Sequence, residues 1–133
     1  MSIVGFTGTR KGMSPHQKWV LSQYLAPDDE FHHGDCVGAD AEAHDMAARL
    51  GCRIVIHPCT LRAQRAFKKG DTVFPPLPPL ERNKIIVDQC EVLCAAPATD
   101  EEELRSGTWA TIRYARRIGR QVIMLKREDA ASC

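Results

Sequence analysis

The stretch that decides the fold is Ser2-Ile3-Val4-Gly5-Phe6-Thr7-Gly8-Thr9-Arg10-Lys11-Gly12. Its first half is a short apolar run that predicts a strand, and its second half is a glycine-bearing turn. Ser14 and Pro15 then predict a helix start, and apolar residues recur on one helix face until Pro27. The chain therefore opens with a strand, a glycine turn and a helix.

The same order repeats through the rest of the chain. The further strands are predicted at 30–33, 52–57, 91–96 and 121–125, and the further helices at 39–50, 80–89 and 106–118. The strands are nearly continuous apolar runs, which is typical of a sheet covered on both faces. We predict an α/β fold, a Rossmann-like doubly wound sheet that is mainly parallel, with five strands and helices on both faces.

The length of 133 residues predicts one domain, 1–133. Inside it, 58–79 shows no clear period, so we expect a lid, a binding loop or a flexible segment there. Its cations either close over a polyphosphate or form a solvated basic loop; they are Arg62, Arg65, Lys68 and Lys69. We expect 126–133 to be a frayed tail.

Charge and composition narrow the function classes. The chain has 18 Lys and Arg and 17 Asp and Glu, a formal net charge of +1. Such a small net charge does not attract the whole protein to nucleic acid or to a membrane. No apolar run has the length of a membrane span, and the first residues do not resemble a signal peptide. We therefore expect a cytoplasmic protein whose six cysteines are reduced thiols. Cys90 and Cys94 lack the second close ligand pair of a zinc site, so no metal is predicted.

Glycine-bearing turns follow three of the predicted strands. They are Gly8-Thr9-Arg10, Gly34 to Asp40, and Ser106-Gly107-Thr108, and a helix follows each of them. In an open α/β sheet such turns lie at the carboxyl ends of the strands, where ligands bind. Helix starts there offer free amides and the positive end of a dipole to an anion, although any one glycine would also serve a tight turn alone. Neither a Walker A loop nor a clean dinucleotide fingerprint is present.

Several polar side chains accompany these turns. Arg10 and Arg82 would bind phosphate through their guanidinium groups, and Asn83 would either join them or cap a helix. Asp40 would either accept hydrogen bonds from a ribose or be an ordinary first-turn acid. Glu81 is the best-placed candidate for general acid or base work, against the simpler interpretation of a solvated carboxylate. The predicted binding residues are Gly8, Thr9, Arg10, Gly34, Gly38, Asp40, Arg82, Asn83, Ser106, Gly107 and Thr108.

These motifs, in this order, resemble the SLOG superfamily. The superfamily groups the lonely-guy phosphoribohydrolases with the DNA-processing A proteins and other nucleotide-sensing domains, and the chain looks most similar to the small YpsA-related proteins of bacteria and phages. The matching segments are Gly8-Thr9-Arg10, His33-Gly34 through Gly38-Ala39-Asp40, Arg82-Asn83, and Gly107-Thr108 after Ala95-Ala96-Pro97. The resemblance implies a Rossmann-like fold that binds a nucleotide-type ligand, with phosphate at Gly107 and Thr108 and with Arg82 near the sugar or base.

The resemblance leaves catalysis open. The phosphoribohydrolases carry a glutamate where this chain has Thr111, so hydrolysis of the base–ribose bond would need an acid from Asp40, Glu81 or residues 101–103. The leading hypothesis is a nucleotide sensor or carrier that requires no cofactor. The alternatives are a nucleosidase or phosphoribohydrolase and, third, a single-stranded DNA binder, for which a basic groove with stacking aromatic residues is missing. The resemblance also suggests a homo-oligomer.

Overall fold

The structure, a computed structural model, describes residues 1–127. Its strands are β1 (Ile3–Gly8), β2 (Glu30–His33), β3 (Arg53–Ile56), β4 (Thr72–Val73), β5 (Val92–Ala96) and β6 (Gln121–Met124). Its helices are α1 (Pro15–Tyr24), α2 (Ala39–Leu50), α3 (Pro79–Gln89), α4 (Gly107–Arg117) and a short 3₁₀ helix, η1 (Arg62–Gln64). Strands and helices alternate as the apolar pattern predicts, and the Rossmann-like α/β class is confirmed.

The strands form one sheet in the order β4-β3-β2-β1-β5-β6, and all neighbouring pairs are parallel. The expected number of five strands is therefore wrong by one. The additional strand is β4, which lies inside the segment 58–79. It pairs with Val55 and Ile56 of β3. Two residues are too few to show a strand period, so the sequence pattern does not reveal β4.

The chain reverses its direction of travel across the sheet at β1. From β1 it runs outward to β2, β3 and β4, and it then returns to place β5 on the other side of β1. Gly8 at the end of β1 pairs with Ala96 at the end of β5. Such a reversal opens a crevice at the carboxyl ends of the two strands, which is where open α/β sheets bind ligands.

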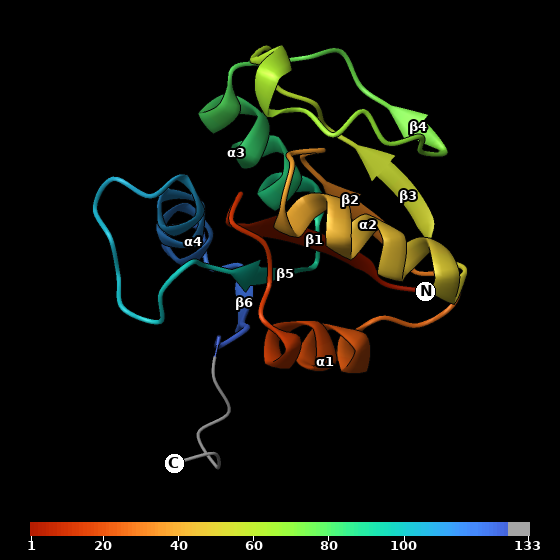
Figure 1. Cartoon of the computed structure of the whole chain (residues 1–133), viewed down its shortest axis with the longest axis horizontal. Coiled ribbons are helices and arrows are strands. Elements are labelled where there is room, and N and C mark those ends of the chain that lie inside the picture. The colour runs from red at the N-terminus through yellow and green to blue at the C-terminus, as the bar shows by residue number, and fades with distance from the viewer. Residues whose placement is uncertain (128–133) are drawn as a thin grey trace.

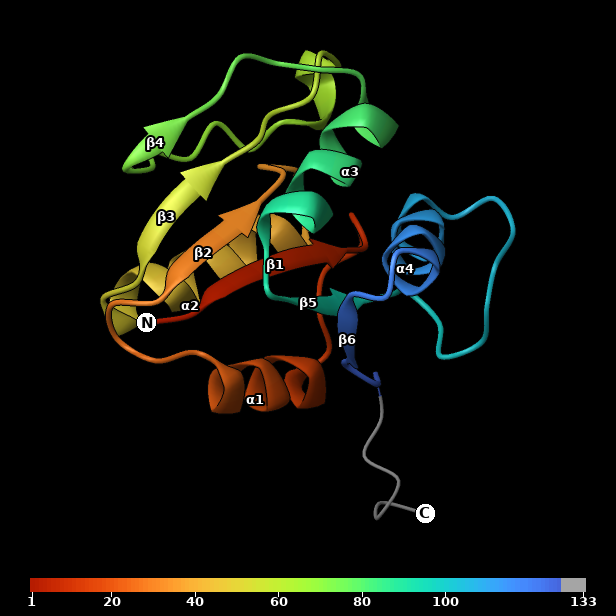
Figure 2. The ribbon, with the colours of Figure 1, turned by 180° about the vertical axis from the view of Figure 1, so that it is seen from behind.

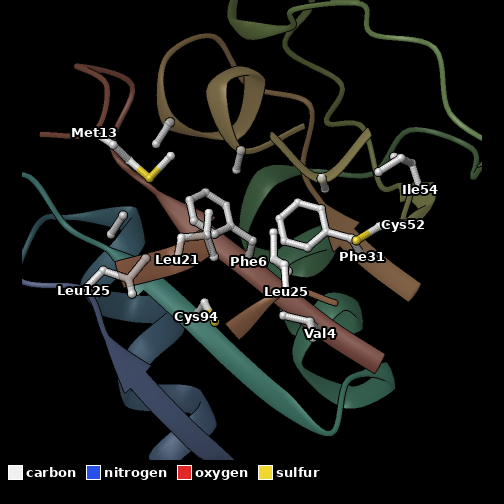
Figure 3. Close-up of a cluster of buried hydrophobic side chains, with 14 of the residues drawn as sticks. Val4, Phe6, Met13, Leu21, Leu25, Phe31, Cys52, Ile54, Cys94 and Leu125 are labelled. Carbon is white, nitrogen blue, oxygen red and sulfur yellow. The ribbon is translucent and has the colours of Figure 1, made fainter. Parts of the chain in front are cut away.

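Two helices cover each face of the sheet. Figures 1 and 2 show α2 over β1 and β2 on one side and α3 over them on the other. The largest apolar cluster joins α1 and α2 to the sheet, and Figure 3 shows Phe6 of β1 and Phe31 of β2 at its centre, with ring centroids 5.9 Å apart. A second cluster joins α3 and α4 to the opposite face through Ile86, Leu93 and Ala115.

Local signals fix the ends of the helices. Ser14 caps α1 in a reciprocal capping box with Gln17, as the Ser–Pro start predicts. Gly51 ends α2 at a φ of 89°, in the left-handed region that glycine adopts without strain.

The expected fraying of the tail is wrong at Arg127. Its backbone N–H donates to Asp100 Oδ1 at 2.9 Å, and its guanidinium donates to Gly12 O and Gln17 Oε1 at 3.1 and 3.2 Å. The rest of the expected tail, 128–133, lies outside the described residues.

Candidate functional site

A polar cavity of about 370 Å³ lies at the carboxyl ends of β1 and β5, between the turns that follow β1, β2 and β5. Its volume is in the range of small-molecule sites. All of the predicted binding residues except Gly38 line it; they are Gly8, Thr9, Arg10, Gly34, Asp40, Arg82, Asn83, Ser106, Gly107 and Thr108. Parallel strands bring their carboxyl ends to one edge, so the fold gathers residues as far apart along the chain as Gly8 and Thr108.

The turn between β5 and α4 is open to the cavity. Ser106 caps α4, and its Oγ accepts a hydrogen bond from the Trp109 N–H at 3.2 Å. The N–H groups of Gly107 and Thr108 have no acceptor within residues 1–127, as is usual at the first turn of a helix. A Cβ built on Gly107 would meet no atom within 4 Å. This turn therefore presents free donors and empty space.

Two arginines that line the cavity have no ion-pair partner within residues 1–127. Arg10 follows the β1 turn and Arg105 precedes the α4 cap; both are exposed, line the cavity and form no ion pair within residues 1–127. Arg105 is a site residue that sequence reasoning missed, because it follows an acidic loop and resembles a solvated charge. Its position next to Ser106-Gly107 is the signal that could have found it.

The turn between β2 and α2 is closed by contrast. Its amide groups are bonded within the protein: those of Asp35, Cys36, Val37 and Ala39 donate to His33 Nδ1, Asp40 Oδ2, Gln64 O and Thr9 O at 2.8–3.1 Å. Gly38 has a φ of 90°, and a Cβ there would lie 2.3 Å from Arg10 O. The chain therefore needs glycine at 38 for close packing of two turns, and the residue lies outside the cavity lining.

Arg82 is a buried structural residue at the cavity wall. Its Nη1 donates to the carbonyl oxygens of Gly34 and of His57, the latter at 2.9 Å, and its Nε donates to Asn83 Oδ1 at 2.6 Å. It is 4% exposed. Its guanidinium ties the ends of β2 and β3 to α3, so Arg82 is not the free phosphate clamp that the sequence pattern suggests. Asn83 is held by this bond and does not cap α3, which begins at Pro79.

Asp40 is the one carboxyl group that lines the cavity within residues 1–127. Burial raises its pKa to about 6, against the opposing effects of the Arg82 charge and the hydrogen bond from the Cys36 N–H. Beside it, burial raises the pKa of the Cys36 thiol to about 11, so that thiol stays protonated at neutral pH. Glu81 is exposed on α3 and outside the cavity lining, and so are the acidic residues 101–103.

The segment 58–79 is anchored to the rest of the domain. The buried Asp35 carboxylate accepts the N–H groups of Phe67 and Lys68 at 3.2 and 2.9 Å and pairs with Arg65. Lys68 also pairs with Asp45 at 3.0 Å. From this segment Leu61, Gln64 and Pro79 line the cavity, and none of its basic residues does. For these basic residues the two alternatives are a lid over a polyphosphate and a solvated basic loop; the structure shows no side chain of the four at the cavity.

Thr111, which stands where the phosphoribohydrolases carry their glutamate, does not line the cavity. Its hydroxyl donates to the Gly107 carbonyl oxygen at 2.9 Å, and the residue borders a surface groove between α3 and α4 instead. Within residues 1–127 no three His, Cys, Asp or Glu side chains are arranged to hold a metal ion. The five cysteines of this part are buried and unbridged, and Cys133 lies outside it.

No helix in the described part of the chain combines the length and apolarity needed to cross a membrane. No protein-family model matches the chain, and no curated protein matches it significantly. It is similar to the X-ray structure of TM1055, a target of the Northeast Structural Genomics Consortium, with a TM-score of 0.63 and 15% sequence identity. The match covers 92% of this chain and 72% of that chain. At this identity the likeness shows a shared Rossmann-like fold.

Proposed function

We propose that the protein binds a nucleotide or a related phosphorylated ligand in the polar cavity, as a sensor or carrier. The observation that carries the proposal is the open turn before α4. Free amides of Gly107 and Thr108 lie at the positive end of a helix dipole, beside empty space and two unpaired guanidinium groups. Backbone amides and arginine are the donors that phosphate prefers.

The rest of the cavity suits the sugar and base of such a ligand. Asn83, Asp40, Thr7 and Thr108 add polar residues to the lining. The resemblance to the SLOG superfamily supports the same class of ligand. It also favours phosphate at Gly107 and Thr108, where the free donors lie.

The second candidate function is hydrolysis of the bond between base and ribose. The observation that favours it is the buried Asp40 carboxyl, because a pKa raised to about 6 keeps part of the population protonated near neutral pH. A general acid works best with a pKa near the working pH. Release of free base from a bound nucleotide, lost in Asp40→Asn, would identify this activity.

Calorimetric titration of the purified protein tests the binding proposal. The ligands are nucleoside monophosphates, ADP-ribose, a cyclic nucleotide, inorganic phosphate and a short single-stranded DNA. We expect one phosphorylated class to bind, and we expect Arg10→Ala and Arg105→Ala each to weaken it about tenfold, the usual effect of losing one hydrogen bond to a charged group. Arg116→Ala is the matched control, since Arg116 is exposed on α4 and outside the cavity lining.

Each contrary outcome has a defined meaning. Binding of the DNA alone would replace the proposal with the third hypothesis. An equal loss of affinity in Arg116→Ala would show that general charge, and not the cavity, holds the ligand. Failure of every ligand to bind would reject the proposed function.

A further inference from the structure

A second cavity, of about 160 Å³, lies on the α3 side of the sheet beyond the end of β3. It is lined by two prolines and by His57, Phe74, Leu77, Arg82 and Ile85. Most of this lining is apolar. The proposed function makes no use of this cavity, and Arg82 is the one residue that lines both it and the polar cavity.

His57 and Arg82 are the polar residues of this lining, and the His57 ring ends a chain of three side chains. Glu30 Oε1 lies 2.6 Å from His32 Nε2, and His32 Nδ1 lies 2.8 Å from His57 Nε2. In the neutral form of the His32 ring the hydrogen lies on Nε2, because the ionised Glu30 carboxylate only accepts, and Nδ1 is bare. His57 must then donate from Nε2. The hydrogen-bond chain thereby leaves His57 Nδ1 as a bare acceptor.

This acceptor has no partner in the described part of the chain, although His57 is only 3% exposed. Within residues 1–127, two side-chain nitrogens are fully enclosed and lack a hydrogen-bond partner: Trp109 Nε1 and Arg120 Nε. His57 Nδ1 is not one of them. It therefore borders open space, and the cavity is the open space that His57 lines. Burial, with the neighbouring His32 and Arg82, lowers the pKa of His57 to about 4. The ring is thus neutral at neutral pH.

The ring is also held in place. It stacks on Phe74, with centroids 4.8 Å apart and planes 12° from parallel. The His57 carbonyl oxygen accepts from Arg82 at 2.9 Å, and its N–H donates to His33 O at 2.9 Å. A fixed acceptor in an apolar wall selects a ligand that carries a donor, because an unpaired buried polar group is costly to leave dry.

We propose that this cavity binds a small neutral aromatic ring bearing one hydrogen-bond donor, a phenol-like group, which donates to His57 Nδ1. An apolar cavity of about 150 Å³ is large enough to hold benzene, so the present volume fits a six-membered ring. Arg82 separates this site from the polar cavity, and the proposal does not depend on nucleotide binding.

Phenol and toluene are the matched probes, since they share a ring and differ in the donor. We measure affinity by NMR titration and follow the ring nitrogens of His57 in ¹⁵N-labelled protein. We expect phenol to bind at least about fivefold more tightly than toluene, the effect of one neutral hydrogen bond. Phenol should shift the His57 nitrogen resonances, and toluene should leave the Nδ1 resonance in place. Equal affinities, or a phenol complex in which that resonance does not move, would overturn the proposal.

A cavity-filling variant locates the site. In Leu77→Trp the indole occupies the cavity, and we expect phenol binding to fall more than tenfold. Leu104→Trp is the matched control, because Leu104 is 86% exposed and lines none of the cavities described. Ile85→Phe fills the same space from α3 and replaces Leu77→Trp if that variant does not fold. Unchanged phenol affinity in a folded filling variant would refute the site, whatever phosphate titrations of the polar cavity show.

Discussion

The β2–α2 turn and the β5–α4 turn both line the polar cavity, and each brings a glycine and a helix start to it. They use these features in opposite ways. In the β2–α2 turn the amides donate to protein acceptors, and Gly34 packs against the Arg82 guanidinium. In the β5–α4 turn the amides of Gly107 and Thr108 are free, and the space beside Gly107 is empty.

The difference separates two reasons for glycine in such a turn. A Cβ on Gly34 would lie 2.4 Å from Arg82 Nη1 and 3.0 Å from Asp40 Oδ2, so glycine is required there because the protein fills the space. A Cβ on Gly107 would touch nothing, so the protein itself does not require glycine there. Empty space at a helix start points to a ligand, whereas filled space points to the fold. The two turns therefore predict opposite responses to the same substitution.

The largest effect is expected for Gly34→Ala. The new methyl group must displace a buried guanidinium that donates to the carbonyl oxygens of Gly34 and His57. Overpacking and broken buried hydrogen bonds together destabilise the fold by about 3 kcal/mol or more. Urea unfolding followed by circular dichroism measures the loss. A variant as stable as the wild type would show that the β2–α2 turn is not closed in solution.

A smaller effect is expected from the carboxyl group of the closed turn. Burial raises the pKa of Asp40 from an unfolded value near 3.9 to about 6. A raised pKa in the folded state favours folding at low pH, so this contribution is complete below about pH 4 and is lost as pH rises through 6. Asp40→Asn removes this dependence and keeps an oxygen for the Cys36 N–H. Relative to wild type, the variant should gain on the order of 2 kcal/mol between pH 4 and pH 7.5.

Paired urea denaturations at the two pH values measure this gain. The other titratable groups are the same in both proteins, so their contributions cancel in the difference. A wild-type-minus-variant difference that does not change with pH would mean that Asp40 is charged and well solvated in the fold. The closed turn would then hold an ionised Asp40 at no cost to the free energy of unfolding.

Much of the fold that carries these two turns could be predicted from the sequence. The parts that could not be predicted have physical reasons. Apolar periodicity and glycine turns predict the alternation of strands and helices, including the weak strand at Glu30–His33. They also predict that the turns after β1, β2 and β5 meet at one edge, since parallel strands share a direction. They do not predict β4, because a strand of two residues has no period and depends on its partner β3.

The roles of individual site residues were harder to predict, because they depend on contacts between distant segments. Arg82 and Arg10 look alike in sequence, yet the first donates to carbonyl groups 25 and 48 residues away, and the second forms no ion pair within residues 1–127. Gly34 and Gly107 likewise differ only in what the fold places beside them. Glu81 was a candidate from its position near a helix start, and the helix turns it toward solvent.

The smallest stability effect, and the sharpest test of the open turn, is expected for Gly107→Ala. Alanine at this first helical position meets no atom and restricts the unfolded chain, so stability should rise by about 0.5 kcal/mol. The same methyl group stands where a phosphate oxygen would approach the free amides, so phosphate affinity should fall roughly tenfold, as for one lost charge-assisted hydrogen bond. Urea unfolding and calorimetry on one preparation measure both. Stability and affinity that fall together would mean that Gly107, like Gly34, serves the fold; a gain in stability with a loss of affinity would mean that this glycine keeps space for a ligand.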